Sequence, residues 1–491
     1  MLSPGGNGRF TGTAVIRTFE PFCSTDPALF RRTLRCISLI AALALTACSL
    51  APRYKRPDIP SPGAWRANEV SAPAAWPSAD WWQGFKSTEL NEFIGAAQRM
   101  NDDIAAAIAR VREADAQARI AGAPLLPALA TSGTATRARQ LNVATNGTTT
   151  ANDFSALLGA SYEVDFWGKN RAALDVARLA AVASRYDRVT VELTVMTAVA
   201  STYFQALELH DRLAVASANL ASAQSTLKGL QLEQTVGTIT ALDVAQQETT
   251  VAVLDAAIPP LRQQLLQTID ALAILVGKSP AEVNITSAKL ADLSEPELRP
   301  GLPSELLERR PDVAQAEAQL MGANADIAVA RASFFPSIDL TASGGYASTA
   351  LSTVLNPAGR VFALTAGLTQ PIFEGGALAG QYSYRKARYA ELLADYHKTV
   401  ISAFSNVEDA LVALQQTALQ QQRQADAVAK ARRAYEITQL QFHAGTINIL
   451  TVLNTETALF TAEDAFVQVK FAHLAALLSL FSALGGGWQK A

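Results

Sequence analysis

Residues Val236–Val244 read VGTITALDV, and residues Ala444–Val452 read AGTINILTV. The two stretches share five of nine positions, including Gly-Thr-Ile, and each follows a long run without a helix breaker. Gly237 and Gly445 stand where a helix would end with a residue in the left-handed conformation, which glycine adopts without strain. The repeated stretch therefore predicts two helix ends at matching places in two similar halves of the chain.

A new helix is expected to begin soon after each glycine. Thr240 can act as an N-cap, with Asp243 three residues later to complete a capping box. In the second copy Asn448 can serve as the N-cap, but Thr451 is a poorer partner than an aspartate. Each stretch is thus predicted to be the turn of a helical hairpin.

The helices that lead into both turns are expected to be unusually long. Residues Lys169–Lys228 and Gln381–Ala444, 60 and 64 residues, contain neither Gly nor Pro, the main helix breakers. A continuous helix of the longer run would reach roughly 96 Å. Within the first run, apolar residues alternate at spacings of four and three, which indicates a coiled-coil seam. The seam comprises Leu209, Leu213, Ala216, Leu220, Ala223, Leu227 and Leu230.

Each half also contains two segments with the alternation of a β-strand. In Phe154–Phe166 the even-numbered residues are apolar and the odd-numbered ones mostly polar, and Phe334–Tyr346 repeats this pattern. Pro127–Arg139 and Arg360–Phe373 are their weaker partners. All four segments have about the length that a tilted strand needs to cross a bilayer.

Both halves share one order: strand, loop, strand, glycine corner, long helix, Gly-Thr-Ile turn and returning helix. The glycine corners are DFWGK at Asp165–Lys169 and IFEGG at Ile372–Gly376. Four strands cannot close a barrel, and lipid does not tolerate a sheet with open edges. If these segments span a membrane, several chains must pool their strands, two chains giving eight strands or three giving twelve.

The N-terminal segment has the features of an export signal. An arginine-rich flank precedes the apolar run Cys36–Leu45, which is too short to span a bilayer. Residues Leu45–Cys48 read LTAC and resemble the bacterial lipobox, which implies removal of residues 1–47 and a covalent lipid on Cys48. The alternative is ordinary signal cleavage that leaves Cys48 as a free thiol.

The segment Ala51–Ser87 is rich in Pro and Trp. Because proline at this density disfavours regular elements, we expect an extended tether that runs from the lipid over the protein surface. Trp76, Trp81 and Trp82 are expected to pack down onto that surface.

Composition excludes several classes of function. A formal net charge of −3 gives no electrostatic basis for nucleic-acid binding. The four histidines have no metal-ligand spacing, so no metal site is expected. Glu163 with Asp165, or Glu408 with Asp409, could form acid–base pairs, but no nucleophile elbow, phosphate loop or metal cluster accompanies them. We therefore expect neither an enzyme nor a cofactor beyond the lipid.

Three stretches carry a specific resemblance to a known family. They are WWQGF at Trp81–Phe85, NDDIAAAIARVREADAQAR at Asn101–Arg119 and GLPSELLERRPDVAQAEAQLMGANADIAVARASFFPSIDL at Gly301–Leu340. Together they resemble the TolC-like outer membrane efflux proteins, in the lipoprotein branch of the OprM and NodT type, and the resemblance covers essentially everything after Cys48. It implies a mostly α fold with a transmembrane β-barrel: a homotrimer with a 12-stranded β-barrel in the outer membrane, continued by a 12-helix periplasmic α-barrel.

The resemblance also implies roles for individual residues. Gly237, Thr238, Gly445 and Thr446 would be the hairpin tips that meet a periplasmic adaptor, the membrane fusion protein. Asp243 matches a position that helps to tie neighbouring helices together when the tunnel is closed.

The positions that narrow the pore in relatives differ in this chain. Thr451 and Asn454 stand where relatives can carry a ring of aspartates, and Ile447 stands where the best-known relative has arginine. Threefold rings of neutral polar groups cannot collect cations as carboxylates do. With Asp243, these residues are predicted to form a periplasmic gate that is held by packing and hydrogen bonds more than by charge.

The predicted domains are a signal peptide with an extended leader (1–47), a lipid-anchored extended segment (48–87) and two structural repeats (88–300 and 301–491). The predicted function is a passive exit duct in the outer membrane for drugs or other small molecules, supplied by an inner-membrane RND or ABC transporter through the adaptor. Two alternatives stay open. One is an outer membrane conduit for protein or glycolipid secretion, and the other is a lipid-anchored coiled-coil scaffold without a pore.

Overall fold

The computed structural model describes residues 52–66, 75–142, 147–286 and 289–489. All of them belong to one compact unit, residues 50–491, and the arrangements below lie within that unit. The predicted signal peptide and the lipidation site Cys48 lie outside the described residues.

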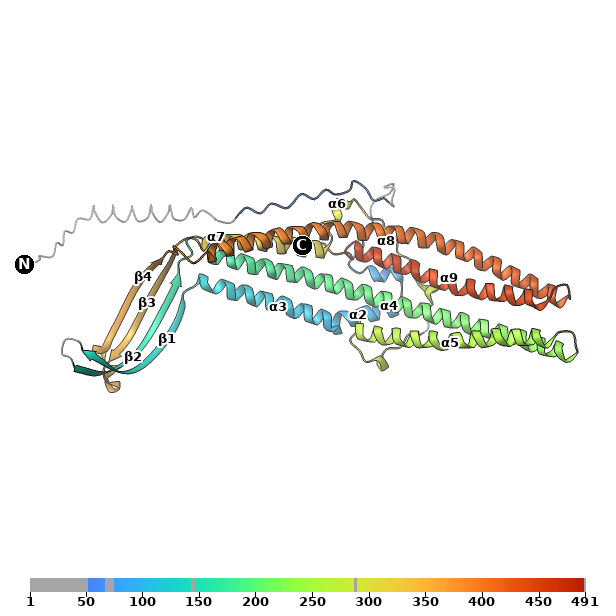
Figure 1. Ribbon diagram of the computed structural model, residues 1–491, viewed down its shortest axis with the longest axis horizontal. Helices are drawn as coiled ribbons and strands as arrows, with labels where there is room; N and C mark the ends of the chain where they lie inside the picture. Colours follow the sequence, from blue (N-terminus) through green and yellow to red (C-terminus); the bar gives the residue numbers. More distant parts are fainter. Residues whose placement is uncertain (1–51, 67–74, 143–146, 287–288, 490–491) are drawn as a thin grey trace, which may run out of the picture. The chain divides into compact units, whose positions relative to one another are not determined.

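The four predicted strands are confirmed and form one antiparallel sheet in the order β1-β2-β3-β4 (Figure 1). Their bounds are Ala128–Asn142, Gly147–Glu163, Ser337–Ser348 and Arg360–Thr369. The central pair β2–β3 joins the two halves of the chain, with registers such as Ala160 opposite Ala342. Within the described residues β1 and β4 each pair on one side only, so the sheet has two open edges.

The register gives the sheet two chemically different faces, as the alternation predicted. One row across all four strands consists of Leu129, Ala160, Ala342 and Leu364, every one of them apolar. The adjacent row, on the other face, consists of Ala128, Ser161, Thr341 and Thr365. A sheet of this kind suits lipid on one side and water on the other.

Two hairpins of long helices follow the strands, and their lengths repeat between the halves. The first is α4 (Lys169–Thr235, 67 residues) with α5 (Ala241–Leu275, 35 residues). The second is α8 (Ala377–His443, 67 residues) with α9 (Ile449–Ala483, 35 residues). The predicted order is confirmed in both halves. Figure 1 shows the sheet at one end of α4 and α8 and the two turns at the other end.

A shorter helix precedes each pair of strands and packs along the long helices. These are α3 (Asp102–Gly122) against α4, and α7 (Pro311–Ala332) against α4 and α8. The remaining elements are the α-helices α2 (Thr88–Met100) and α6 (Pro303–Leu306) and the 3-10 helices η1 (Trp81–Phe85), η2 (Ala123–Leu125), η3 (Pro280–Glu282), η4 (Leu290–Asp292), η5 (Leu351–Thr353) and η6 (Pro357–Gly359).

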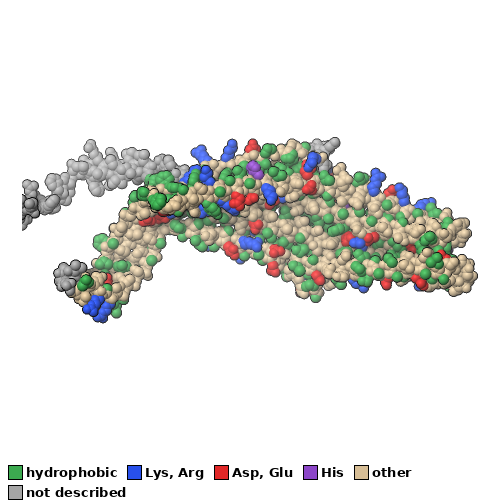
Figure 2. Space-filling model, viewed as in Figure 1, with side chains coloured by type: hydrophobic (Ala, Val, Ile, Leu, Met, Phe, Trp, Pro, Cys, Tyr) green, Lys and Arg blue, Asp and Glu red, His purple; other side chains and the backbone are tan. Residues whose placement is uncertain are grey.

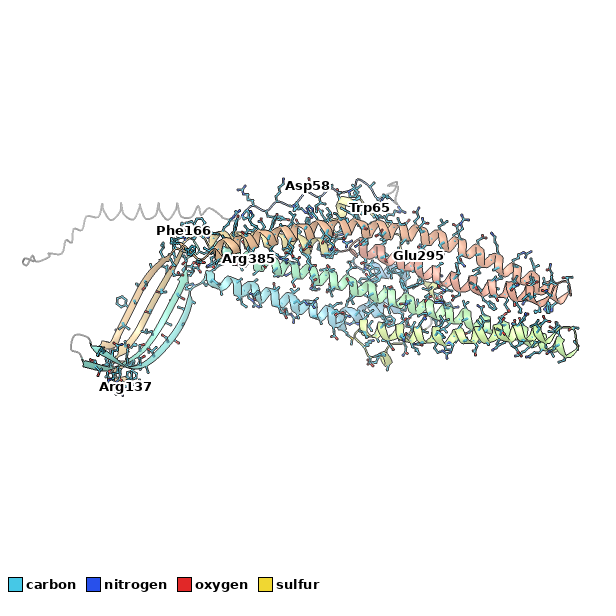
Figure 3. The ribbon with its side chains drawn as sticks, viewed as in Figure 1. Asp58, Trp65, Arg137, Phe166, Glu295 and Arg385 are labelled. Carbon is cyan, nitrogen blue, oxygen red and sulfur yellow. The ribbon has the colours of Figure 1, made fainter. Side chains whose placement is uncertain are left out.

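The corner between the sheet and α4 is built by the DFWGK motif. Gly168 has φ +77° at the N-cap, and the Asp165 carboxylate accepts hydrogen bonds from the backbone N–H groups of Asn170 (2.9 Å) and Arg171 (3.0 Å). A carboxylate at a helix N-terminus accepts from N–H groups that have no partner within the helix, and its negative charge interacts favourably with the helix dipole. Figure 3 places Phe166 at this corner and Arg137 at the opposite end of the sheet.

The Pro- and Trp-rich segment departs from the prediction at its C-terminal end. Residues 52–62 form no helix, strand, bend or turn, as expected of a tether, but Trp81–Phe85 forms the helix η1. Trp81 is buried and stacks on Phe481 at the end of α9, with ring centroids 4.9 Å apart. Trp81 thus packs down as expected, and Trp82 packs against the same core. The difference from the prediction is that a short helix, and not an extended strap, carries these rings.

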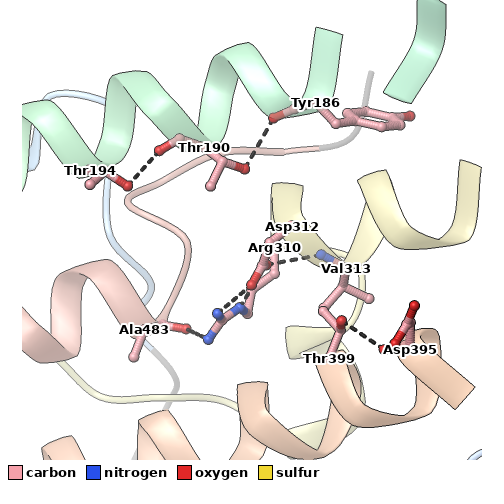
Figure 4. Close-up of polar contacts among 9 residues, drawn as sticks. All are labelled: Tyr186, Thr190, Thr194, Arg310, Asp312, Val313, Asp395, Thr399 and Ala483. Carbon is pink, nitrogen blue, oxygen red and sulfur yellow. Dashed lines mark hydrogen bonds and ion pairs between the residues drawn. The ribbon is translucent and has the colours of Figure 1, made fainter. Parts of the chain in front are cut away.

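The signature ERRPDV also has a structural explanation. Arg310 pairs with Asp312 (2.6 Å) and donates to the carbonyl of Ala483 (3.1 Å), as Figure 4 shows. A cation at the carboxyl end of a helix neutralises its dipole. The start of α7 is thereby fastened to the end of α9.

Of the helices that the structure describes, only α9 is long and apolar enough to cross a membrane, and half of its most apolar window is buried. It packs on α4 and α8, so we interpret it as a core helix. Charged side chains are spread along the helices on the face shown in Figure 2.

Candidate functional site at the two hairpin turns

The first turn ends α4 with a Schellman motif. Gly237 has φ +80°, its N–H donates to the carbonyl of Gln234 (3.0 Å), and the N–H of Thr238 donates to the carbonyl of Glu233 (3.1 Å). These are the two bonds that define the motif. The hydroxyl of Thr238 donates to the same Glu233 carbonyl at 2.8 Å. Both residues of the Gly-Thr pair are therefore used to close the helix.

The second turn repeats this geometry. Gly445 has φ +67°, its N–H donates to Phe442 (2.8 Å), and both the N–H (3.0 Å) and the hydroxyl (2.9 Å) of Thr446 donate to Gln441. The predicted left-handed helix ends are confirmed. The four residues Gly237, Thr238, Gly445 and Thr446 are all exposed.

The helices that leave the turns begin differently, also as predicted. Thr240 and Asp243 form a full capping box, in which the Asp243 carboxylate accepts from both the N–H (2.9 Å) and the hydroxyl (2.7 Å) of Thr240. Asn448 caps α9 by accepting from the N–H of Thr451 (3.2 Å), and the Thr451 hydroxyl donates to it as well (3.0 Å). The return bond from position N3 is present only in the first turn.

The predicted gate residues are distributed around the start of α5 and α9. Asp243 is half-buried and engaged in its cap, whereas Thr451 and Asn454 are exposed. Ile447 is half-buried against an apolar cluster that α4, α5, α8 and α9 form above the turns. We name this cluster the tip cluster; it consists of Ala223, Leu230, Val244, Tyr435, Ile449, Val452, Leu453, Leu459 and Phe460.

The tip cluster encloses a polar residue that was not among the predicted site residues. Glu456, on α9, is fully buried and bonds to Tyr435 of α8 and Gln247 of α5. The signal was present in the sequence, because Glu456 follows Val452 and Leu453 at helical spacing on the apolar face of α9.

Ion pairs hold the second hairpin together and tie it to the first. Arg212 of α4 binds Asp464 of α9 through two bonds (2.7 and 3.2 Å) and also Glu208 one turn earlier on its own helix (3.2 Å). Burial raises the pKa of the Glu208 carboxyl, and the adjacent Arg212 opposes that shift. Arg432 of α8 and Glu463 of α9 pair at 2.6 Å.

The carboxylates considered as acid–base pairs have local structural partners. Glu163 pairs with Lys169 (3.2 Å), beside the helix-capping Asp165, while Glu408 accepts from the N–H of Arg66 (2.9 Å). In the part of the chain that the structure describes, no group of His, Cys, Asp or Glu is arranged to hold a metal.

Comparison with known proteins identifies the family. The sequence model of the outer membrane efflux proteins matches the chain twice, at residues 93–278 and 302–486. The pyoverdine export outer membrane protein OpmQ of Pseudomonas aeruginosa is 39% identical over 466 residues, covering 93% of this chain and 98% of that protein. The toluene efflux pump outer membrane protein TtgF of Pseudomonas putida is 32% identical over 466 residues, covering 92% and 97%.

A solved structure shows the same fold. The open state of the MtrE outer membrane channel of Neisseria gonorrhoeae superimposes with a TM-score of 0.82 at 27% identity, covering 90% of this chain and 99% of that one. Taken with the two matched halves and the repeated strand, helix and turn geometry, these likenesses show that the chain belongs to the outer membrane efflux protein family, as a transport component of the outer membrane that extends into the periplasm and not as an enzyme.

Proposed function

We propose that three copies of this chain form one channel, the exit duct of a tripartite efflux pump. Each copy contributes its four strands to a 12-stranded barrel and α4, α5, α8 and α9 to a 12-helix tunnel. The observation that carries the proposal is the sheet with one apolar face and two open edges. Such a sheet is stable in lipid only when its edges are paired.

The polar face of the sheet favours three copies over two. An eight-stranded barrel is just wide enough for side chains to fill its interior, whereas wider barrels enclose an aqueous channel. The row of Ser161, Thr341 and Thr365 is polar and suits a water-filled lumen.

Native mass spectrometry of the detergent-purified protein tests the stoichiometry. We expect a complex of three processed chains. A stable monomer or dimer as the dominant species contradicts the proposal.

The two turns are proposed to contact the adaptor. In each turn the N–H and hydroxyl donors of the Gly-Thr pair are satisfied internally and a left-handed glycine is exposed with open space around it, so a partner helix hairpin can approach closely. Val236→Cys, beside the first glycine, should cross-link to the purified adaptor. Leu266→Cys, at an exposed position far along α5, serves as the control and should not. Equal cross-linking at both positions contradicts the assignment.

The adaptor is proposed to join the channel to an inner-membrane RND or ABC transporter, which supplies the energy. Adaptor binding opens the gate only if it favours the open state over the closed one. The named relatives export pyoverdine and toluene, and we propose small molecules of this kind as the cargo. The test is to express this chain in a cell that lacks its own outer membrane channel and to measure export of small molecules. Restored export of small molecules is expected, and restored export of proteins alone contradicts the proposal.

The gate is proposed to comprise Asp243, Ile447, Thr451 and Asn454, with no carboxylate ring on α9. Glu456 is buried on α9, and Asn454, two residues earlier on the same helix, is exposed. The Asn454 side chain is therefore available to line the passage. Asn454→Asp should raise the cation preference of single channels, because a ring of carboxylates attracts cations. Asn454→Gln, which changes the side chain without adding charge, is the control and should leave the cation preference as it is. An unaltered cation preference in Asn454→Asp counts against this gate.

A covalent lipid on Cys48 is proposed to hold the N-terminus in the outer membrane. The first described residues support this, because the carbonyl of Pro52 accepts from Asn324 of α7 (2.8 Å) and so lies along the helices. Intact-mass measurement should show lipid on the natural protein and none on Cys48→Ala. The same mass increment on both contradicts the assignment.

A further inference from the structure

Glu456 occupies the point where all four long helices meet. Its side chain is 0% exposed. One carboxyl oxygen accepts from the hydroxyl of Tyr435 on α8 (3.0 Å) and from that of Ser222 on α4 (3.5 Å). The other accepts from the amide of Gln247 on α5 (3.5 Å), which also donates to the carbonyl of Ala223 (2.8 Å). A single carboxyl thus links α9 to both arms of the first hairpin and to the other arm of its own.

No cation compensates this carboxyl among its described neighbours. The groups that face it are Ser222 and Thr226 from α4, Gln247 from α5 and Tyr435 from α8, and only Tyr435 among them titrates. Burial raises the pKa of Glu456, and the hydrogen-bond donors oppose the rise only in part. A buried acid without a charged partner tends to take up a proton instead of remaining ionised.

The two protonation states of Glu456 satisfy different groups at this site. The ionised carboxylate matches three donors but carries an unpaired charge inside an apolar cluster. The protonated acid removes the charge but makes one oxygen a donor. Gln247 Oε1, a buried acceptor, has no hydrogen-bond partner. The helices are therefore held together by a group whose preferred state depends on proton concentration.

We infer that Glu456 is a proton-sensitive lock between the two helical hairpins, which couples periplasmic acidity to the gate. The inference rests on the proposed channel function. Asn454 and Thr451 precede Glu456 on the same helix but are exposed, so a movement of α9 that admits water to Glu456 displaces both gate residues. Opening thus requires the four-helix junction at Glu456 to loosen, and the protonation state of Glu456 sets how readily it does.

The direction of the effect follows from proton linkage. In the loosened state Glu456 is hydrated, and its pKa falls toward the ordinary value of about 4.3. The packed state, with the raised pKa, binds the proton more tightly. Proton binding therefore stabilises the packed state over the loosened one. This stabilisation is complete below the ordinary pKa of glutamate and is lost as the pH rises through the raised pKa of Glu456. Acid therefore holds the junction closed, and rising pH releases it.

The test is a pH titration of single-channel open probability in planar bilayers. For the natural channel we expect the open-to-closed ratio to rise steadily as the pH is raised from about 5 to about 8, by about tenfold per chain for each unit by which the Glu456 pKa differs between the closed and open states. Glu456→Gln, a neutral side chain of the same shape, should vary less than about twofold over that range and stay mostly closed. The control Glu436→Gln, exposed on α8 beside Tyr435, should titrate like the natural channel.

A second variant separates proton sensing from a loss of packing. Tyr435→Phe keeps the ring but removes the closest donor to the carboxylate, so the pKa of Glu456 should rise and the midpoint of the titration should shift to higher pH. A natural channel that conducts but does not respond to pH, or a Glu456→Gln variant that titrates normally, overturns the lock while leaving the channel intact. A protein that conducts no ions at any pH overturns the channel itself and the lock with it.

Discussion

Two glycines decide where the long helices end. At Gly237 and Gly445 the backbone has positive φ, and a Cβ at either position would meet nothing within 4 Å. The requirement for glycine is therefore conformational and not steric. The threonine that follows each glycine completes the motif with its hydroxyl. Repetition of the Gly-Thr pair reflects the need to end two helices of equal length at the same level.

Gly237→Ala isolates this conformational cost. An L-residue in the left-handed region costs about 1–2 kcal/mol, so we expect the variant to be destabilised by about 1 kcal/mol. Gly229→Ala is the matched control, because Gly229 lies inside α4, is exposed and also has open space around it. There alanine should stabilise by about 0.5–1 kcal/mol. Urea denaturation of both variants measures the difference, and a stabilised Gly237→Ala contradicts the proposed strain.

At the residue scale the sequence predicts the caps but not the buried acid. Glycine and the capping residues act through local backbone geometry, which a short stretch of sequence specifies completely. Glu456 depends on which faces of four helices converge, and its partners lie up to 234 residues away along the chain. The hydrophobic pattern marks Glu456 as anomalous but cannot name those partners.

At the scale of elements, the alternation of each strand fixes which face meets lipid. Leu364 is 78% exposed and lies in the all-apolar row, whereas the next residue, Thr365, lies in the polar row. Neighbouring positions on β4 therefore belong to opposite environments.

Leu364→Arg should impair insertion and assembly. A basic side chain on the lipid face near the middle of the bilayer costs about 2–4 kcal/mol. Thr365→Arg places the same group on the lumen face, where it should assemble normally and alter only conductance. The two variants are compared by their heat-modifiability on gels and by the yield of membrane-inserted protein. Equal assembly of both variants contradicts the assigned orientation of the sheet.

The length of the two long helices can be predicted because it depends on the absence of helix-breaking residues. Lys169–Lys228 and Gln381–Ala444 contain no Gly or Pro, and the helices α4 and α8 that form there each run for 67 residues, with Gly229 and Gly380 accommodated near their ends. The same rule fails for α5, which continues through Pro259 and Pro260. Each proline removes a backbone donor, so packing of α5 on α4 must offset the loss. Tertiary contacts of this kind override the local helix preference of the sequence, and the local sequence does not predict them.

At the scale of the whole molecule, the duplicated plan leads directly to oligomerisation. Each half supplies two strands and one long hairpin, and the halves meet at the β2–β3 pair and at the contacts of α4 with α7 and α9. The plan predicts that several chains share one barrel, since four strands leave two edges open. Counting strands alone allows either eight or twelve, because the number of copies depends on the curvature of the sheet and on contacts between chains that no single sequence displays.

Ion conductance by the purified protein is the most direct test that these strands enclose a shared passage. Added to a planar bilayer, the protein should produce discrete current steps of uniform size, each marking one assembled channel. A protein that shows the circular dichroism of folded helix and sheet and inserts into the bilayer, yet leaves it electrically silent at every voltage and pH, would contradict the account.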